Sequence, residues 1–331
     1  MLSGSFSKLS MSYVLGIDGG GTKTICILMD ENSLVLGRGE AGQSNYQTLG
    51  IERAKQSIQL AIERAVLSAK IEANSNFNIE AICLGLAGVG RQKDIEIVQF
   101  LVQNLQLTNT LPVTRSFLPR NIVICSDCVI ALVGGTGYPV GITVISGTGS
   151  IVFGQNSQGK TKRVGGWGYL LGDEGSGYDI AVQGLQAALK FYDGRGDFTA
   201  LAENFQNHLG LNHLEELVEV VYRRGWGVKE IAALAPIVDR VAAEGDRVAD
   251  GIINSAVAEL TFSTKIAISA LFNPREEFEI VLVGGVWGGE ANCRGRFEAA
   301  ITAIAPTAKV ILPRYEPAFG AGLLALNALN N

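Results

Sequence analysis

The sequence predicts an α/β protein built from two halves that repeat the same order of elements. Short apolar runs alternate with longer runs in which apolar residues recur every three to four positions, a pattern typical of strands alternating with amphipathic helices. Each half opens with an apolar run that ends in a turn of glycine and threonine, at residues 18–24 and again at 146–150. The turns lie about 128 residues apart, which is too long for a solenoid repeat. We therefore expect a duplicated domain with a cleft between the halves.

The first half is expected to form a mixed sheet flanked by helices. Three consecutive strands imply antiparallel hairpins, whereas the later strand-helix-strand units imply parallel strands. The longest helix is recognised by Ile51, Ile58 and Ile62, which fall on one helical face. In order, we expect strands at 13–17, 24–29 and 34–40, a helix at 50–72, a strand at 79–86, a helix at 94–105, a strand at 121–125 and a short helix beginning at 127–134.

The second half repeats this order and carries an extra, mostly helical segment. The repeat implies a second mixed, five-stranded sheet, since each half supplies the same five strand signals. In order, we expect strands at 140–145, 151–153 and 160–164, a helix at 176–191, the helical insertion at about 198–272, a strand at 279–283, a helix at 291–304, a strand at 309–312 and a last helix at 317–328.

Composition excludes several classes of protein. A chain of 331 residues is long enough for two domains with substantial cores. A net charge of −5 argues against nucleic acid as a partner, and no apolar run reaches the ~18 residues of a membrane span. Residues 1–12 lack the apolar core of a signal peptide, so we expect a flexible tail, a cytoplasmic location and reduced cysteines.

The two glycine-threonine turns are candidate phosphate sites. Such turns expose backbone N–H groups and a hydroxyl, both of which suit a phosphate, although plain turn chemistry stays open. Neither turn is a Walker loop, because no Gly-Lys-[Ser/Thr] opens a helix there. The candidate residues are Gly19, Gly20, Gly21 and Thr22 in the first turn and Gly147, Thr148 and Gly149 in the second.

Five motifs in a fixed order resemble one known family. They are GIDGGGTKT at 16–24, Ser126-Asp127, ISGTGS at 145–150, GGWGYLLGDEGS at 165–176 and VGGVW at 283–287. Across residues 13–326 this order resembles the actin/hexokinase/chaperone-ATPase superfamily, and more closely the BadF/BadG/BcrA/BcrD-type ATPase family with its N-acetylglucosamine kinase members. The resemblance implies two ribonuclease-H-like (actin-like ATPase) domains at 13–126 and 127–316, with residues 317–331 as a terminal helix that packs back on the first domain.

The resemblance also implies an activity. We expect an ATP-dependent kinase that uses Mg²⁺ and phosphorylates an amino sugar, with N-acetyl-D-glucosamine the leading acceptor and its 6-phosphate the product. Glucosamine and N-acetylmuramic acid stay open as acceptors. A homodimer is an open possibility for the oligomeric state.

An activator-type ATPase of the same family is a second hypothesis. Cys125 and Cys128 argue against it, since they flank the proposed base rather than lying on an exposed loop. A redox or metal role for this pair has little support without a second Cys/His pair. A sugar sensor without catalytic activity is the third hypothesis.

Two aspartates carry the expected chemistry. Asp18 closes a strand just before the glycines, where a carboxylate could hold Mg²⁺ beside the ATP phosphates. The alternative is a turn aspartate that bonds its own backbone. Asp127 ends a buried strand and is the expected general base and sugar ligand, as the resemblance implies for the equivalent aspartate. The alternative is an aspartate that caps the following helix.

The remaining ligands are assigned by resemblance. Asn45, Gly166, Trp167, Gly168 and Asp173 are expected to contact the sugar, although Trp167 could instead belong to the core or anchor the loop. Gln47 is a departure, because animal N-acetylglucosamine kinases carry an aromatic residue two places after the asparagine. The adenosine of ATP is expected at Gly284, Gly285 and Gly289, with Ala242 at its border. The spacing of these glycines does not fit a nicotinamide dinucleotide.

Overall fold

The computed structural model describes residues 12–69, 78–107, 114–115, 117–223 and 225–330, and it divides into two compact units. Unit 1 comprises the chain up to Pro139 together with the segment from Arg314 onward, and unit 2 comprises Val140–Pro313. The domain boundary expected between residues 126 and 127 lies before the helix Asp127–Thr136, whereas the structure divides the chain after this helix, between Pro139 and Val140. The tail expected at residues 1–12 and the end of the helix expected at 50–72 extend outside the described residues.

The sheet of unit 1 is mixed. Three strands run antiparallel to their neighbours: β1 (Ser12–Gly19), β2 (Lys23–Asp30) and β3 (Val35–Gly42). On the other side of β1 lies the parallel strand β4 (Asn78–Leu86), which pairs first with β5 (Thr114–Arg115) and then with β6 (Ile122–Ser126). Six strands thus occupy five positions, because β5 and β6 follow one another along β4.

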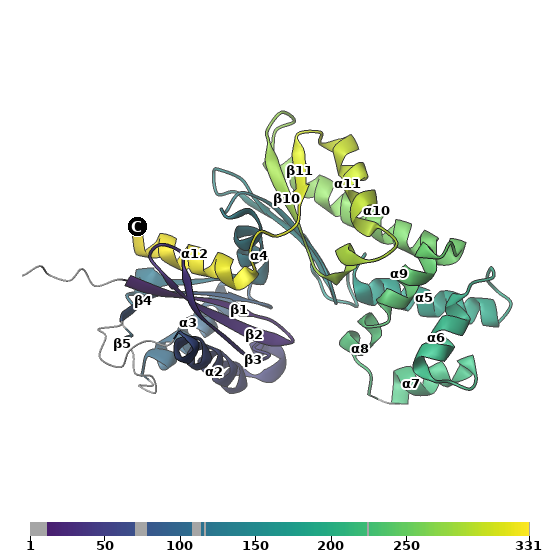
Figure 1. Ribbon diagram of the computed structural model, residues 1–331, viewed down its shortest axis with the longest axis horizontal. Coiled ribbons are helices and arrows are strands. Elements are labelled where there is room, and N and C mark those ends of the chain that lie inside the picture. Colours follow the sequence, from purple (N-terminus) through teal and green to yellow (C-terminus); the bar gives the residue numbers. More distant parts are fainter. Residues whose placement is uncertain (1–11, 70–77, 108–113, 116, 224, 331) are drawn as a thin grey trace, which may run out of the picture. The chain divides into compact units, whose positions relative to one another are not determined.

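Helices cover both faces of this sheet. α2 (Ile51–Ser68) and α3 (Gln92–Leu107) share one core with the side chains of Leu15 and Ile17. α4 (Asp127–Thr136) and α12 (Pro317–Asn330) share a second core with Val14 on the opposite face (Figure 1). α12 can lie close to β1 because Gly16 has no side chain there: a Cβ at Gly16 would come within 2.4 Å of the Ala318 carbonyl oxygen.

Unit 2 repeats the sheet of unit 1. β7 (Gly141–Ser146), β8 (Ser150–Gln155) and β9 (Thr161–Gly165) are antiparallel, and β10 (Phe278–Val283) and β11 (Ala308–Ile311) are parallel to β7. The order β11-β10-β7-β8-β9 matches β6-β4-β1-β2-β3 strand for strand. The predicted α/β fold with two duplicated mixed sheets is therefore confirmed.

The helices of unit 2 share one core with this sheet. α5 (Gly177–Tyr192) follows β9, and α11 (Cys293–Ile304) lies between β10 and β11 in sequence (Figure 1). The expected insertion forms α6 (Leu201–Leu209), α7 (Leu217–Arg223), α8 (Val228–Ala232), α9 (Ala235–Ala243) and α10 (Arg247–Leu271). Among the described helices, none has both the length and the hydropathy needed to cross a membrane.

Candidate functional site

The first glycine loop, residues 19–22, is held by its carbonyl groups and leaves its tip open. The carbonyl oxygen of Gly19 accepts a hydrogen bond from Ala87 N–H at 2.8 Å, and that of Gly20 accepts one from Ser44 N–H at 3.1 Å. Gly21 and Thr22 are exposed, and no described residue accepts a hydrogen bond from their N–H groups. The loop therefore presents two backbone donors and a hydroxyl, which is the arrangement expected of an anion site.

Asp18, at the end of β1, lies in an acidic environment. Burial, followed by the negative charges of Asp127 and Glu316, raises the pKa of Asp18 to about 6, and Lys23 acts in the opposite direction. Two carboxylates from other segments of unit 1 are thus close enough to repel that of Asp18. A divalent cation bound at Asp18 would relieve this repulsion, and carboxylate oxygens are ligands that Mg²⁺ prefers.

Asp127 opens α4 immediately after β6. Ser126 is the N-cap of this helix, so Asp127 is its first residue and not its cap. Asp127 Oδ1 accepts hydrogen bonds from Cys128 N–H at 2.9 Å and from Cys128 Sγ at 3.4 Å. No hydrogen bond or ion pair from a described residue reaches Oδ2. One carboxylate oxygen is therefore available to accept a proton or a hydrogen bond.

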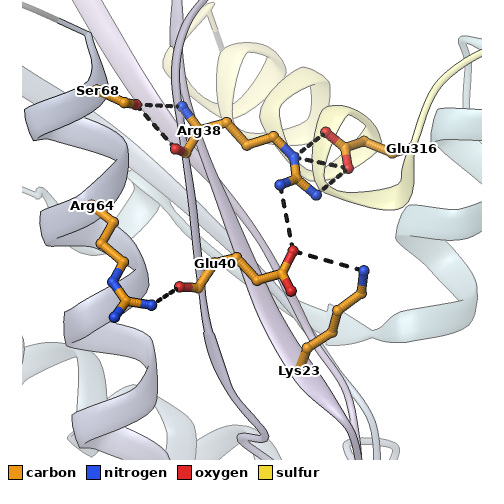
Figure 2. A network of polar contacts seen from close by, with 6 residues as sticks. All are labelled: Lys23, Arg38, Glu40, Arg64, Ser68 and Glu316. Carbon is orange, nitrogen blue, oxygen red and sulfur yellow. Dashed lines mark hydrogen bonds and ion pairs between the residues drawn. The ribbon is translucent and has the colours of Figure 1, made fainter.

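A network of charged side chains borders this region (Figure 2). Arg38 Nε lies 3.1 Å from Glu316 Oε1, which links β3 to the residue just before α12. Arg38 Nη1 also lies 3.5 Å from Glu40 Oε2, and Lys23 Nζ lies 3.8 Å from the same oxygen. Such exposed pairs contribute little to stability individually. They do fix where Glu316 and Lys23 stand, and these are two of the charges that set the pKa of Asp18.

The second glycine loop, residues 147–149, is anchored to the segment that leads into α5. Ser146 Oγ donates to the Gly175 carbonyl at 2.7 Å, and Gly177 N–H donates to the Gly147 carbonyl at 2.7 Å. The N–H groups of Thr148 and Gly149 have no acceptor within the described ranges, and Thr148 is exposed. This loop also presents two backbone donors and a hydroxyl, as in unit 1.

A cavity of about 650 Å³ opens beside the second glycine loop within unit 2. This volume falls in the range of sites for small molecules and cofactors. Its lining combines the loop, the start of α5, the α8–α9 region and the glycine-rich segment after β10: Gly147, Thr148, Gly177, Ile180, Lys229, Ala232, Ala233, Ala235, Pro236, Asp239, Ile253, Gly285, Val286, Gly288, Gly289 and Glu290.

Two close contacts hold the glycine-rich wall of this cavity. Gly284 has φ +110°, and a Cβ there would lie 2.1 Å from the Ser146 carbonyl oxygen, so only glycine fits. Asp239 on α9 accepts hydrogen bonds from Glu290 N–H at 2.5 Å and from Ala291 N–H at 3.3 Å. A Cβ on Gly289 would come within 2.3 Å of the same carboxylate. The wall is thus fixed from both sides.

Comparison with known proteins identifies the family. The model of the BadF/BadG/BcrA/BcrD ATPase family matches residues 15–325. The chain belongs to this family. Membership of the BadF/BadG/BcrA/BcrD ATPase family implies that the protein uses ATP, as expected from the sequence.

Two relatives match over nearly their whole length. The chain is 35% identical to an N-acetylmuramic acid/N-acetylglucosamine kinase of Clostridium acetobutylicum, over 95% of this chain and 98% of that protein. It is 33% identical to an N-acetyl-D-glucosamine kinase of Dictyostelium discoideum, over 97% of this chain and 99% of that protein. A crystal structure of a proposed N-acetylglucosamine kinase from Chromobacterium violaceum is similar with a TM-score of 0.72 and 25% identity, and covers 96% of this chain and 99% of that one.

The structure gives the surroundings of three expected ligands of this BadF/BadG/BcrA/BcrD-type chain. Ala242 is 5% exposed in the core of unit 2 and is absent from the described lining of the cavity; Pro236 and Asp239 of the same helix line it instead. Asp173 is 8% exposed, and its carboxylate accepts hydrogen bonds from Ser150 N–H and Gly168 N–H, so it braces two loops. Trp167 is 69% exposed and lies under the Arg163 guanidinium, so the core alternative is wrong.

The other expected ligands fall into two groups. Asp18, Asn45 and Asp127 lie in unit 1 with the first glycine loop, and the Gly166–Gly168 loop lies in unit 2 with the second. Asp239 and Glu316 were not anticipated from the sequence. An aspartate on a helix of the insertion looks like any solvent-facing aspartate, and no local pattern links it to a segment 51 positions later.

Proposed function

We propose that this protein is an ATP-dependent kinase that phosphorylates an amino sugar, with N-acetyl-D-glucosamine the leading acceptor and its 6-phosphate the product. The observation that carries the proposal is Asp127, which keeps one carboxylate oxygen without a described partner and lies within electrostatic reach of Asp18 beside the first glycine loop. The two kinases at 35% and 33% identity support the same class of acceptor.

In the proposed reaction, the acceptor O6 attacks the γ-phosphorus of ATP. The O6–H bond breaks as the new P–O bond forms, the proton moves to Asp127, and ADP leaves. Asp127 aligns the hydroxyl and receives its proton late, which typically contributes ~10²–10⁴-fold to the rate. The adenosine half of ATP would occupy the 650 Å³ cavity of unit 2, with phosphate oxygens at the N–H groups of Thr148 and Gly149. The proposal requires that the first glycine loop reaches the transferred phosphate.

Asp18 is the residue proposed to hold Mg²⁺. Its raised pKa and its two carboxylate neighbours fit a site that is relieved by a cation. Within the described residues, no set of three His, Cys, Asp or Glu side chains forms a complete ligand group, so phosphate oxygens and water would supply the other ligands. When bound, Mg²⁺ neutralises charge on the phosphate oxygens.

The alternative within the family is an activator-type ATPase. The placement of the cysteines supports the kinase: Cys128 is 2% exposed beneath Asp127, and Cys125 hydrogen-bonds to the buried Cys83 of the neighbouring strand. Glucosamine and N-acetylmuramic acid stay as alternative acceptors. The cleft between the halves, a homodimer and a cytoplasmic location stay predictions.

The proposal is tested by ADP release with each of three sugars, N-acetylglucosamine, glucosamine and N-acetylmuramic acid, and without sugar. We expect release that depends on the sugar and on Mg²⁺, with a 6-phosphate identified by mass spectrometry and NMR. ADP release at the same rate without sugar would contradict the kinase proposal and favour the activator-type ATPase.

A further inference from the structure

Asn45, Gln47 and Gly88 converge on one point of unit 1. An ideal Cβ built on Gly88 would lie 3.3 Å from Asn45 Oδ1, 3.3 Å from Gln47 Oε1 and 3.1 Å from Gln47 Cδ. Gly88 has φ +83°, so an L side chain is disfavoured there on backbone grounds as well. A side chain at Gly88 would therefore press on both amides.

Hydrogen bonds within the cluster decide which amide atoms remain available. Asn45 Oδ1 accepts from Gln47 N–H at 3.0 Å, because Asn45 is the N-cap of the short helix α1 (Tyr46–Leu49). Gln47 Nε2 donates to the Gly88 carbonyl at 2.7 Å. Across the described chain, no hydrogen bond involves Asn45 Nδ2 or Gln47 Oε1. The two amide atoms without a described partner are therefore Asn45 Nδ2, which donates, and Gln47 Oε1, which accepts.

This donor and acceptor are held in place from three directions. The Tyr46 hydroxyl donates to Asp94 Oδ1 at 2.6 Å, which fixes α1 against α3. Ser44 and Ala87, the residues just before Asn45 and Gly88, donate their N–H groups to the first glycine loop at 3.1 and 2.8 Å. Because the amides are fixed before any ligand arrives, little ordering is needed on binding.

We propose that Gln47 is a specificity-determining residue whose Oε1 accepts a hydrogen bond from a hydroxyl of the acceptor, next to the hydroxyl oxygen to which Asn45 Nδ2 donates. The inference rests on the proposed function. A donor beside an acceptor matches two adjacent hydroxyls. A hexose with nitrogen at C2 and phosphate transferred to O6 has one adjacent pair of free hydroxyls, O3 and O4. Gln47 and Asn45 therefore hydrogen-bond to the O3 and O4 hydroxyls. The amide of Gln47 takes the place of the aromatic residue of the animal N-acetylglucosamine kinases.

The test compares the protein and its Gln47→Met variant on N-acetylglucosamine, its 3-deoxy analogue and its 4-deoxy analogue. We expect Gln47→Met to lower kcat/KM for N-acetylglucosamine about tenfold, chiefly through KM, as for one lost hydrogen bond between neutral groups. For one deoxy sugar, kcat/KM should be about tenfold lower than for N-acetylglucosamine with the unaltered protein, but less than about twofold lower with Gln47→Met, since the variant has already lost the acceptor. For the other deoxy sugar, kcat/KM should fall by the same factor with both proteins. If both deoxy sugars lose equal factors with both proteins, Gln47 contacts neither hydroxyl and the inference is overturned.

Two further variants separate this role from a structural one. Gln47→Glu keeps an acceptor oxygen and, like Gln47→Met, loses the N–H that donates to the Gly88 carbonyl. It should therefore keep the sensitivity to the deoxy sugar if that sensitivity comes from the acceptor, and lose it if it comes from the bond to Gly88. Gln103→Met changes an exposed glutamine on α3 in the same way and should leave all three sugars unaffected. If the unaltered protein phosphorylates no amino sugar, the proposed function itself fails. If it phosphorylates N-acetylglucosamine, but each deoxy sugar lowers kcat/KM by the same factor with the unaltered protein and with Gln47→Met, only the inference about Gln47 fails.

Discussion

Replacing Asp18 by asparagine should stabilise the protein in the absence of ligand. Burial and the charges of Asp127 and Glu316 raise the pKa of Asp18 from 3.8 to about 6. Well below pH 3.8 the carboxyl is protonated in both the folded and unfolded states. Between pH 4 and 6 the unfolded state loses its proton first, so folding becomes less favourable as pH rises. At about 1.4 kcal/mol per pKa unit, the ionised Asp18 costs up to about 3 kcal/mol at pH 7, and Asp18→Asn removes that cost.

The assay is urea-induced unfolding of both proteins at pH 4, 5, 6 and 7, without nucleotide or Mg²⁺. Far-UV circular dichroism is the suitable signal, because Trp167, Trp226 and Trp287 all lie in unit 2 and their fluorescence reports on that unit. The difference in stability should grow from a small fraction of its full size at pH 4 to its full size above pH 6. An unchanged or lower stability of Asp18→Asn at pH 7 would refute the reasoning.

Asp94 supplies a control of opposite sign. Its hydrogen bond from the Tyr46 hydroxyl, with others from the backbone, lowers its pKa to about 2. A lowered pKa contributes stability above the unfolded value of 3.8 that is lost as pH falls toward 2. Asp94→Asn should therefore destabilise the protein at neutral pH.

Three further predictions concern the reaction and the core. Asp127→Asn should lower kcat by ~10²–10⁴-fold while calorimetry still detects ATP binding; near-normal turnover would remove Asp127 from the role of base. Asp239→Asn should raise KM for ATP about tenfold with kcat within about twofold, because the Glu290–Ala291 backbone loses its anchor; Asp250→Asn, in an exposed ion pair, is the matched control. Gly16→Ala should cost unit 1 about 1–3 kcal/mol by circular dichroism, since its Cβ meets the backbone of α12. Gly42→Ala, with 3.7 Å of clearance, should cost little.

The sequence predicted the elements well because their signals are local. Apolar runs followed by glycine marked β1 and β7, and Asp18 lies near the end of β1 as expected. Asp127 was expected to end a buried strand, but it is the first residue of α4, and β6 before it is only partly buried. Side-chain roles that depend on contacts between distant segments were not predictable. The hydrogen bonds of Asp173, an expected sugar ligand, run to Ser150 and Gly168, and no local pattern specifies these partners.

The side-chain amide of Asn45 is a second example in which the sequence did not predict which atoms are available for a ligand. From the sequence, an asparagine was expected both to donate to and to accept from a diol. The structure occupies its oxygen with the N–H of Gln47, because Asn45 caps α1. The acceptor in this cluster is instead on Gln47, the residue that departs from the animal N-acetylglucosamine kinases. Which atom is available follows from the helix that begins there, and that could not be foreseen from residue type.

The position of α12 has a consequence for synthesis of the chain. Ala318, Ala321 and Ala325 complete the core that covers one face of the sheet of unit 1, and they come from the last helix of the described chain. On the ribosome, every residue of unit 2 emerges before this helix does. Unit 2 can therefore fold as a continuous segment while one apolar face of the sheet of unit 1 is still uncovered, although the strands of unit 1 are synthesised first. For this architecture, the N-terminal half is the last to be finished.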